Sequence, residues 1–553
     1  MTQDHPAFAL SDHVVDLLAE LRPAMATMCG IPGHDGRWDD VSPDGQGAFR
    51  ERLVAAQTQI SALPRAEDRW DALAVHVLEE VVGREIATID RDPPTMWLNH
   101  LASPFQMFPL TLENMDPSTP EAVEDLVSRL DGLDVAMEQY RQHLEHQIGQ
   151  GRTVSRRQVV SCIAQGRTMA EHRSFQHHAD RAARAGHPEA LVQHVRSAAD
   201  RAQDVHARLT DWLESTYLAA AVPHDGVGEQ AYLPEAESFL HVPIEVDDTL
   251  AWGWDEVERL HAELVRELDR AAPGRTLAEA VQMWRTDPST SAPDADAFLD
   301  RIRAWQSDAM DRLGADLPMP EALRNLDIDA SPPGSPPGAW YAGPSEDLSR
   351  PGRVRYSFVG DGPIPLFDQQ STAYHEGFPG HHLQIGIQRS LAGKLSRLHR
   401  AMHHCSGFAE GWALYAEQRM DEHGFYEAPP MRVGMLVNQI ARACRVVLDL
   451  GLHVGRPIPK GACFEPGEAW TFERAVAFMT EIGGLRPEVS ESEVLRYLGW
   501  PGQAISYKVG QRVLLDLRAE FLARGEHPVS EFHRRVLGSG TVGLGRVRAE
   551  VLG

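Results

Sequence analysis

The chain has 553 residues and a formal net charge of −27, because 80 aspartate and glutamate residues outnumber 53 lysine and arginine residues. A chain this acidic, with no local basic stripe, repels phosphate, which argues against a nucleic-acid binder and against attachment to an anionic membrane surface. Hydrophobic residues make up 42% of the chain, enough for a sizeable buried core. Only three residues are lysine: Lys394, Lys460 and Lys508.

Cysteine usage and the N-terminus indicate a cytoplasmic protein. The 5 cysteines are widely spaced and form no CxxC pair, so we expect neither a disulfide framework nor a thiolate zinc site. The N-terminus has no basic segment ahead of an apolar run, and no apolar stretch reaches the length of a membrane span. The sequence does not indicate an oligomeric state.

Helical periodicity dominates the chain. Apolar residues recur every three or four positions over 123–144 and 257–268, which predicts two amphipathic helices. Pro120 after Ser118 and Thr119 predicts a helix start. The polar segment 166–215, rich in arginine, histidine and alanine, predicts long solvated helices. The fold class is therefore expected to be mainly α.

A proline-rich segment interrupts the helices between 330 and 370. Its prolines exclude a helix, and the following GRVRYSFVGD (352–361) alternates apolar and polar residues, which predicts a short strand. Helical patterns return from about 371 to the end. We expect a helical part, 1–330, that walls a cleft, and a part that carries the chemistry, 331–553. The break is either a domain boundary or a long loop inside one continuous domain, and we favour the loop.

The motif TAYHEGFPGHHLQIG (372–386) combines His375, Glu376, His381 and His382. A zinc hydrolase needs imidazole or carboxylate ligands, an open position for water and a carboxylate that takes the proton from that water. The usual HExxH pattern places two histidines one turn apart on a helix. Here the second histidine follows after six or seven positions, and the Gly-Phe-Pro-Gly segment 377–380 can break the helix and bring both ends together.

A third ligand is expected from the segment GFAEGWALYAEQ (407–418). Glu410 has apolar neighbours, and a carboxylate in such company needs a partner, which a cation would supply. Alternatively, Glu410 is an acidic residue at a helix N-terminus. Glu417 follows seven residues later on the same helix face, where it supports the ligands or lies on an exposed face.

Four motifs in order resemble a known family: HEGFPGHHLQ, EGWALYAE, RACRVVLDLGLH (442–453) and RYLGWPGQAISYKVG (496–510). They are similar to the bacterial family called domain of unknown function 885, which resembles the carboxypeptidase Taq and thimet oligopeptidase type of zinc peptidases. The resemblance implies a neurolysin-like helical chain around a deep cleft, with a small β-sheet at its rim. It also implies zinc on two histidines and a glutamate, and comparison with HExGH favours His381 over His382.

The last two motifs supply further candidates. Asp449 and His453 lie one helical turn apart, so they form a surface pair or one of them orients a ligand histidine. Arg442 and Arg445 are three residues apart, and we take Arg445 as a group that can bind a substrate carboxylate. The alternative, favoured in a chain this rich in arginine, is that both are ordinary arginines with no part in binding.

Tyr507 is the expected donor to the oxyanion, as tyrosines are in the related peptidases, and Tyr497 is a second candidate. Lys508 beside it is expected to bind substrate through a compact ammonium group, or alternatively only to cap a packed helix. The strand near 352–358 is expected to be an edge strand that pairs with an extended substrate, or otherwise only a scaffold.

These observations predict a zinc-dependent metallohydrolase that cleaves amide bonds of short peptides in the manner of a carboxypeptidase or oligopeptidase. Zinc, or another divalent metal, would bind His375, His381 and Glu410, and Glu376 would act as general base. The alternatives are a metal-binding protein without catalysis, and a hydrolase of non-peptide amides or esters. Glu376 favours catalysis, because a structural metal site needs no carboxylate beside its first ligand.

Overall fold

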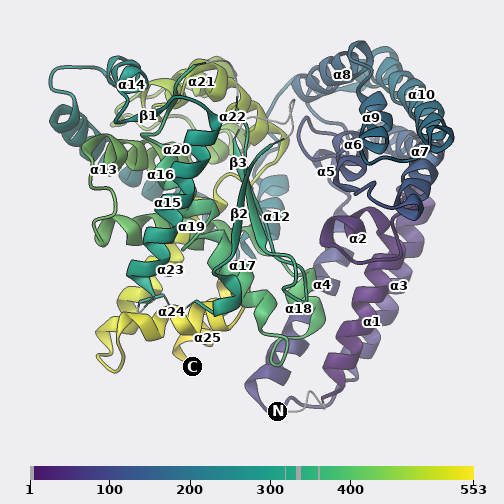
Figure 1. The fold of residues 1–553 in the computed structure, drawn as a ribbon, viewed down its shortest axis with the longest axis horizontal. Helices are drawn as coiled ribbons and strands as arrows, with labels where there is room; N and C mark the ends of the chain where they lie inside the picture. The colour runs from purple at the N-terminus through teal and green to yellow at the C-terminus, as the bar shows by residue number, and fades with distance from the viewer. Residues whose placement is uncertain (1–4, 315, 318, 332–337, 359–361) are drawn as a thin grey trace. The chain divides into compact units, whose positions relative to one another are not determined.

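The structure is a computed structural model that describes residues 5–314, 316–317, 319–331, 338–358 and 362–553 (Figure 1). Its elements are mainly helices, as the periodicity predicts. The chain folds into two units. Unit 1 comprises Met1–Gly226, Ser396–Met402 and Leu498–Trp500; unit 2 comprises Val227–Leu395, His403–Tyr497 and Pro501–Gly553.

The division between the units lies before the proline-rich break, not at it. Residues 227–330 supply four α-helices and two strands of unit 2, and the chain continues within the same unit after the break. The break is therefore a connection inside unit 2. Its prolines at 332, 333, 336 and 337 lie outside the described residues.

Unit 1 consists largely of helices, and half of the α-helices named below begin at a proline, where the missing N–H is not needed. The longest, α7, begins as predicted: Thr119 accepts a hydrogen bond from the backbone of Ala122, and Pro120 takes the first helical position. The helices of this unit are α1 (Pro6–Leu21), α2 (Pro23–Cys29), α3 (Pro43–Ser61), α4 (Arg69–Arg91), α5 (Pro94–Trp97), α6 (Pro104–Asn114), α7 (Pro120–Gly149), α8 (Arg156–Glu171), α9 (His177–Arg184), α10 (Glu189–Trp212), α11 (Leu218–Ala220) and α18 (Arg397–Ala401).

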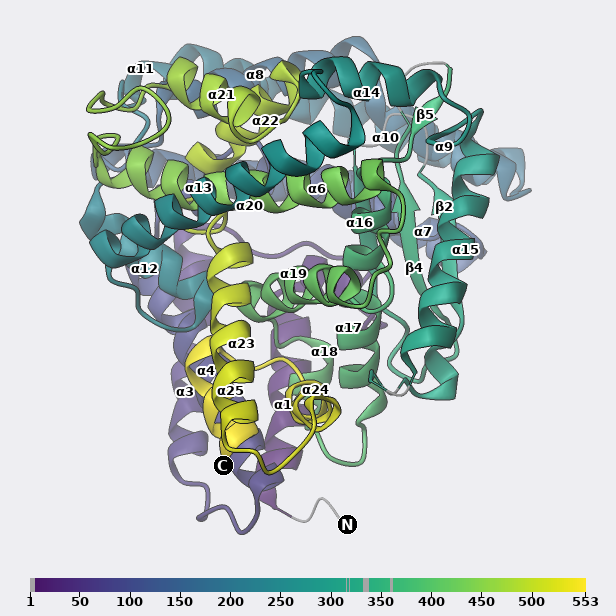
Figure 2. The same cartoon turned by 90° about the vertical axis from the view of Figure 1, so that its left-hand side faces the viewer.

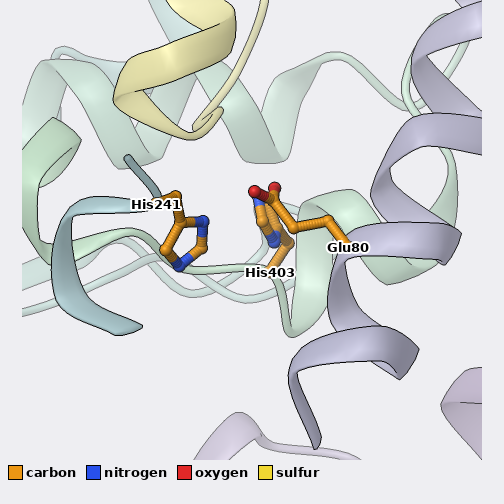
Figure 3. Close-up of side chains that lie close together, drawn as sticks. All are labelled: Glu80, His241 and His403. Carbon is orange, nitrogen blue, oxygen red and sulfur yellow. The ribbon is translucent and has the colours of Figure 1, made fainter. Parts of the chain in front are cut away.

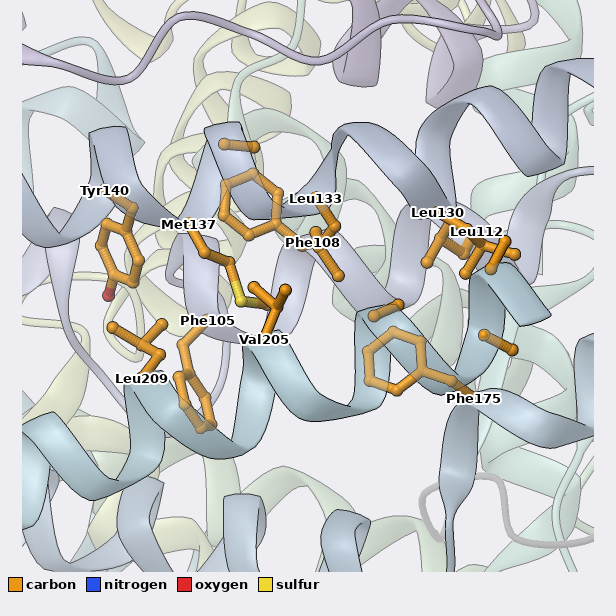
Figure 4. Close-up of a cluster of buried hydrophobic side chains, with 14 of the residues drawn as sticks. Phe105, Phe108, Leu112, Leu130, Leu133, Met137, Tyr140, Phe175, Val205 and Leu209 are labelled. Carbon is orange, nitrogen blue, oxygen red and sulfur yellow. The ribbon is translucent and has the colours of Figure 1, made fainter. Parts of the chain in front are cut away.

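The core of unit 1 lies among α6, α7 and α10 (Figure 4). Phe108 of α6 and Met137 of α7 are buried there together with Val205 and Leu209 of α10. The prediction of solvated helices over 166–215 is therefore only half right. The alanines of α10 that the composition placed on a polar helix form a buried face, because alanine lets neighbouring helices approach closely.

Unit 2 carries the C-terminal motifs on a second set of helices, and α13 and α20 run side by side in it (Figure 2). These helices are α12 (Glu229–Leu240), α13 (Val246–Ala271), α14 (Leu277–Thr286), α15 (Ala295–Leu313), α16 (Gln369–Glu376), α17 (His381–Ser390), α19 (Ser406–Glu422), α20 (Pro429–Val454), α21 (Phe472–Glu481), α22 (Pro487–Gly499), α23 (Ser506–Ala523), α24 (Val529–Gly538) and α25 (Leu544–Leu552). Among the described residues, no helix is long and apolar enough to span a bilayer.

The strands of unit 2 are short: β1 (Ser291–Ala292), β2 (Leu326–Ala330), β3 (Ala339–Ala342), β4 (Gly352–Tyr356) and β5 (Ile364–Pro365). β4 is the strand that the alternation predicts, with Val354 and Tyr356 buried. It pairs with β2 in parallel and with β3 antiparallel. The predicted edge strand is thus the central strand of its sheet, and both of its edges are already hydrogen-bonded, so it has no edge to offer a substrate backbone.

A close crossing of α19 and α23 brings two of the C-terminal motifs together. Gly510 of α23 lies against Gly407 and Gly411 of α19, and a Cβ at Gly510 would overlap with the backbone oxygen of Gly407. Only glycine permits this separation of the two backbones. The crossing holds Glu410 and Tyr507, which are on these helices, in one region of unit 2.

Candidate metal centre

The break in the first motif lies where the sequence predicts it. α16 ends at Glu376 and α17 begins at His381. At Gly380 the chain folds back onto the last turn of α16, and a Cβ there would overlap with the backbone oxygen of His375. The turn brings the rings of His375 and His381 to a centroid separation of 4.8 Å. An unbroken helix would hold these two rings on different faces.

Two side chains from other helices hold this turn. Gln306 of α15 donates from Nε2 to the oxygen of Ala373 at 2.9 Å and accepts from the backbone N–H of Phe378 at 2.6 Å. Trp412 of α19 donates from its indole N–H to the oxygen of Pro379 at 3.0 Å. Sequence reasoning missed Gln306, because a single glutamine on a distant helix carries no signal.

The structure brings together the three predicted ligands. Glu410 Oε2 lies 3.2 Å from His375 Nε2 and 3.6 Å from His381 Nε2. Three potential ligand atoms from these residues all lie within 4.8 Å of one another. Two ligands about 2.1 Å from one tetrahedral zinc ion are about 3.4 Å apart. The separations between the carboxylate and both imidazoles therefore fit a single ion of that size.

The neighbouring His382 faces away from this group. It donates from Nε2 to the oxygen of Leu323 at 2.7 Å, and the hydroxyl of Tyr341 lies 3.0 Å from its Nδ1. Its side chain is fully buried, and burial lowers its pKa. Of the two adjacent histidines, the structure places His381 at the other predicted ligands.

A second carboxylate, that of Glu417, contacts the His375 ring at Nδ1, the nitrogen that does not face Glu410. Glu417 Oε1 lies 2.7 Å from His375 Nδ1, while Glu417 Oε2 accepts from Ser371 Oγ at 2.6 Å and from Gln439 Nε2 at 3.1 Å. A histidine that donates its Nδ1–H to a carboxylate presents the lone pair of Nε2, which is the form that binds a metal. Glu417 thus has the supporting position that its spacing from Glu410 allows.

Asp449 and His453 do not have that position. Asp449 Oδ2 accepts from the hydroxyl of Tyr232 at 2.8 Å and from the backbone N–H of Gly502 at 2.9 Å. His453 donates from Nε2 to the oxygen of Tyr497 at 3.0 Å. Both side chains tie α20 to neighbouring segments. The prediction that one of them orients a ligand histidine is therefore wrong, and Glu417 has that role instead.

The electrostatics of the three residues favour a cation between them. Burial lowers the pKa of His375, but hydrogen bonds to Glu410 and Glu417 outweigh it and raise this pKa to about 9. Burial raises the pKa of Glu410, yet hydrogen bonds to His375 and His381 hold it well below its usual range. Two carboxylates on one imidazole stabilise positive charge there, whether a proton or a metal ion supplies it.

Glu376, the last residue of α16, lies beside the first ligand. Burial raises the pKa of its carboxyl, and the nearby His381 and His375 oppose this increase without cancelling it. Among the described residues, none donates a hydrogen bond to this carboxylate. A carboxyl with a raised pKa and no fixed donor suits a group that accepts a proton from water and returns it.

Tyr507, at the start of α23, lies beside His375 as predicted for a donor at the site. The two rings are stacked with centroids 6.3 Å apart and planes 20° apart. Burial raises the pKa of the phenol, and the charge of Glu410 adds to the effect. The phenol therefore stays protonated and can donate a hydrogen bond.

Arg445 supports Tyr507 instead of facing a substrate. Its Cζ lies 4.5 Å from the centroid of the Tyr507 ring, at cation–π distance. Its Nη2 donates to Glu493 at 2.9 Å and its Nε to the hydroxyl of Tyr497 at 3.1 Å. Tyr497 in turn donates to Glu493 at 2.6 Å, so this second candidate donor is already in use.

Lys508 is buried and has no free donor for a substrate. Its ammonium lies 2.8 Å from Glu256, 3.1 Å from Gln439 Oε1 and 2.7 Å from Gln511 Oε1. Only 2% of its surface is exposed. These contacts fit a structural role within packed helices, as in the alternative to substrate binding, better than they fit substrate binding.

A pocket of about 390 Å³ is lined by the three residues that contact the ammonium of Lys508. Glu256, Gln439 and Gln511 line it, together with Trp252 and Arg512. The predicted metal ligands do not line this pocket. The deep cleft around the ligands, implied by the resemblance to peptidases, stays an expectation.

Within the described part of the chain, two other places gather histidines with a nearby carboxylate. In unit 1, His177 Nε2 lies 2.6 Å from Glu113, with His178 beside it, but Arg181 lies 3.8 Å from the same carboxylate and already supplies positive charge. In unit 2, the rings of His241 and His403 lie 5.7 Å apart (Figure 3). The sequence motifs point to neither place.

Comparisons with known proteins give a family and a fold. The family model described as "Bacterial protein of unknown function (DUF885)" matches residues 23–551. A crystal structure named as the putative lipoprotein from Colwellia psychrerythraea is similar with a TM-score of 0.86 and 22% identity, over 99% of this chain and 98% of that one. A putative lipoprotein of unknown function from Shewanella oneidensis is similar with a TM-score of 0.74 and 16% identity, over 99% and 100%. No curated protein matches the sequence.

Proposed function

The chain belongs to the bacterial DUF885 family, and we propose that it is a zinc-dependent hydrolase that cleaves amide bonds of short peptides. The observation that carries the proposal is the group of His375, His381 and Glu410, whose ligand atoms lie within 4.8 Å of one another. Glu376 beside them has the position of a general base. Two imidazoles and one carboxylate suit zinc, and another divalent metal can take the same ligands.

Each residue then has a defined task. A zinc ion held by the three ligands would polarise the substrate carbonyl and lower the pKa of a water molecule. Glu376 accepts the proton of the attacking water and returns it to the leaving nitrogen. The phenol of Tyr507 donates to the oxygen that gains negative charge. Glu417 keeps Nδ1 of His375 protonated, so that Nε2 stays available as a ligand.

Two other functions fit the same ligands less well. A protein that only stores or displays a metal needs no raised-pKa carboxyl next to its first ligand, and Glu376 is such a group. A hydrolase of esters or non-peptide amides would use the same residues. The resemblance to carboxypeptidases and oligopeptidases favours peptides among these substrates.

We further propose a cytoplasmic location. The alternative is the cell envelope, because the two similar structures are named as lipoproteins. Fractionation of the native host, with detection of the full chain by an antibody, distinguishes the two. Recovery with the envelope fraction would contradict the cytoplasmic proposal.

The test combines metal analysis of the purified protein with digestion of a library of short peptides. We expect one equivalent of zinc and cleavage of a subset of the peptides. Glu376→Gln keeps the size of the side chain but cannot accept a proton, so this variant should retain zinc and lose cleavage. Wild-type protein that takes up no zinc, or full cleavage by Glu376→Gln, would overturn the proposal.

A further inference from the structure

The ammonium of Lys508 makes three contacts with three oxygen atoms. It lies 2.8 Å from Glu256 of α13, 3.1 Å from Gln439 of α20 and 2.7 Å from Gln511 of its own helix, α23. A lysine ammonium has three N–H donors and no acceptor. Every donor therefore has a partner, and each partner must present an oxygen to it.

This requirement fixes the direction of the Gln439 side chain. Because its Oε1 faces the ammonium, its NH₂ group must point the opposite way. There it donates from Nε2 to Glu417 Oε2 at 3.1 Å. A glutamine amide turned by half a rotation would instead present its oxygen to the carboxylate, and the two would repel each other.

Glu417 continues the contacts to His375. Its side chain is fully buried, and Oε1 lies 2.7 Å from His375 Nδ1. A buried carboxylate keeps its position only while its oxygens have donors. The NH₂ group of Gln439 is one of these donors, and the hydroxyl of Ser371 is another. Lys508, Gln439, Glu417 and His375 thus form one chain of hydrogen bonds across four helices.

From this chain we propose that Lys508 is a positioning residue for the metal centre, acting on His375 through Gln439 and Glu417. The inference rests on the proposed function, because it assigns Lys508 a role in that centre. Without the ammonium, the amide of Gln439 can turn, Glu417 loses a fixed donor, and Nε2 of His375 is held less firmly toward the metal. The inference also explains why this site has one of only three lysines: a planar guanidinium does not reproduce three contacts around one nitrogen.

The test measures zinc affinity by competition with a chromophoric chelator, for the wild type, Lys508→Met and Lys460→Met. Lys460 is exposed and follows α20, so its replacement removes the same charge at a distance from the chain of hydrogen bonds. Loss of a group that orients a ligand costs about 10–100-fold in metal affinity. Because Lys508 acts through two intermediates, we expect about tenfold weaker binding for Lys508→Met. Lys460→Met should match the wild type.

A double-mutant cycle separates positioning from general stability. If Lys508 acts through Glu417, Lys508→Met should have little further effect on zinc affinity in a Glu417→Gln background. Equal effects in both backgrounds would overturn the inference. The absorption bands of the cobalt-substituted protein give a second readout, which should change in Lys508→Met while a purely structural role would leave them unchanged.

The same zinc measurements cover a variant that does not fold, and they separate failure of the inference from failure of the proposed function. If Lys508→Met does not fold, Gln439→Met interrupts the same chain and leaves Lys508 with Glu256 and Gln511, and it should weaken zinc binding in the same way. If Lys508→Met and Gln439→Met bind zinc as tightly as the wild type does, the inference fails and the proposed function stands. If the wild type binds no zinc, the proposed function fails and the inference with it.

Discussion

Replacing His381 or His382 by alanine, one at a time, should damage two different properties of the protein. The two residues are adjacent and chemically identical, so each is the matched control of the other. His381 has its Nε2 3.6 Å from Glu410, whereas His382 is bound to Leu323 and Tyr341. The first variant should therefore lose metal affinity and the second should lose stability.

The magnitudes follow from these contacts. Zinc binds structural peptide sites with about 10–16 kcal/mol, so one of three or four ligands is worth about 3 kcal/mol, or about a hundredfold in Kd. His381→Ala should show a loss of this size and a small change in stability, because no described residue bonds to Nδ1 of His381. His382→Ala leaves the buried oxygen of Leu323 without its donor, which lowers the free energy of unfolding by about 1–3 kcal/mol. The cavity left by the missing imidazole lowers it further.

Both properties can be measured on the same preparations. Chelator competition gives the zinc affinity, and urea unfolding of the metal-free protein gives the free energy of unfolding. We expect His381→Ala to unfold near the wild-type urea concentration with weakened zinc binding, and His382→Ala to show the reverse. If His382→Ala loses zinc while His381→Ala keeps it, our assignment of the second ligand is refuted.

Two further predictions concern Tyr507 and Asp449. Tyr507→Phe removes the phenol donor and leaves the ring, so kcat should fall by about a hundredfold with zinc content unchanged, whereas an unchanged kcat would exclude Tyr507 as the oxyanion donor. Burial raises the pKa of Asp449 to about 7, so the folded protein keeps a proton that the unfolded chain releases near pH 4. Stability should therefore fall as the pH rises from about 4 to about 7, and Asp449→Asn should flatten that fall in a pH series of urea unfolding. An identical pH dependence in wild type and variant would show that Asp449 is not the group responsible.

The sequence predicted those features that depend on local patterns. Periodicity over 123–144 and 257–268 predicted α7 and α13, and the alternation around Val354 predicted β4. The Gly-Phe-Pro-Gly segment 377–380 predicted the break between α16 and α17, because its residues disfavour a continuous helix. Identification of His381 needed the comparison with related motifs, since spacing alone left two histidines open.

Features that depend on contacts between distant segments were missed or mistaken. β4 was expected at an edge, but strand order is set by pairing with β2 and β3, which the sequence of one strand does not encode. α10 was expected to be solvated, because its alanines do not reveal which face is covered.

The same limit applies around the candidate site. Glu417, Asp449 and His453 were all predicted as possible supports of a ligand histidine, and only the contact of Glu417 with His375 separates them. The partners of Lys508 come from α13, α20 and α23, and no motif joins these helices. The sequence therefore singled out Lys508 as unusual but assigned it to substrate binding.

The most direct test of the metal centre is anomalous diffraction at the zinc absorption edge from crystals of the zinc-loaded protein. We predict one strong anomalous peak in contact with His375 Nε2, His381 Nε2 and a carboxylate oxygen of Glu410. A crystal with no peak among these three residues, or with its peak at Glu113 and His177, would contradict the central claim.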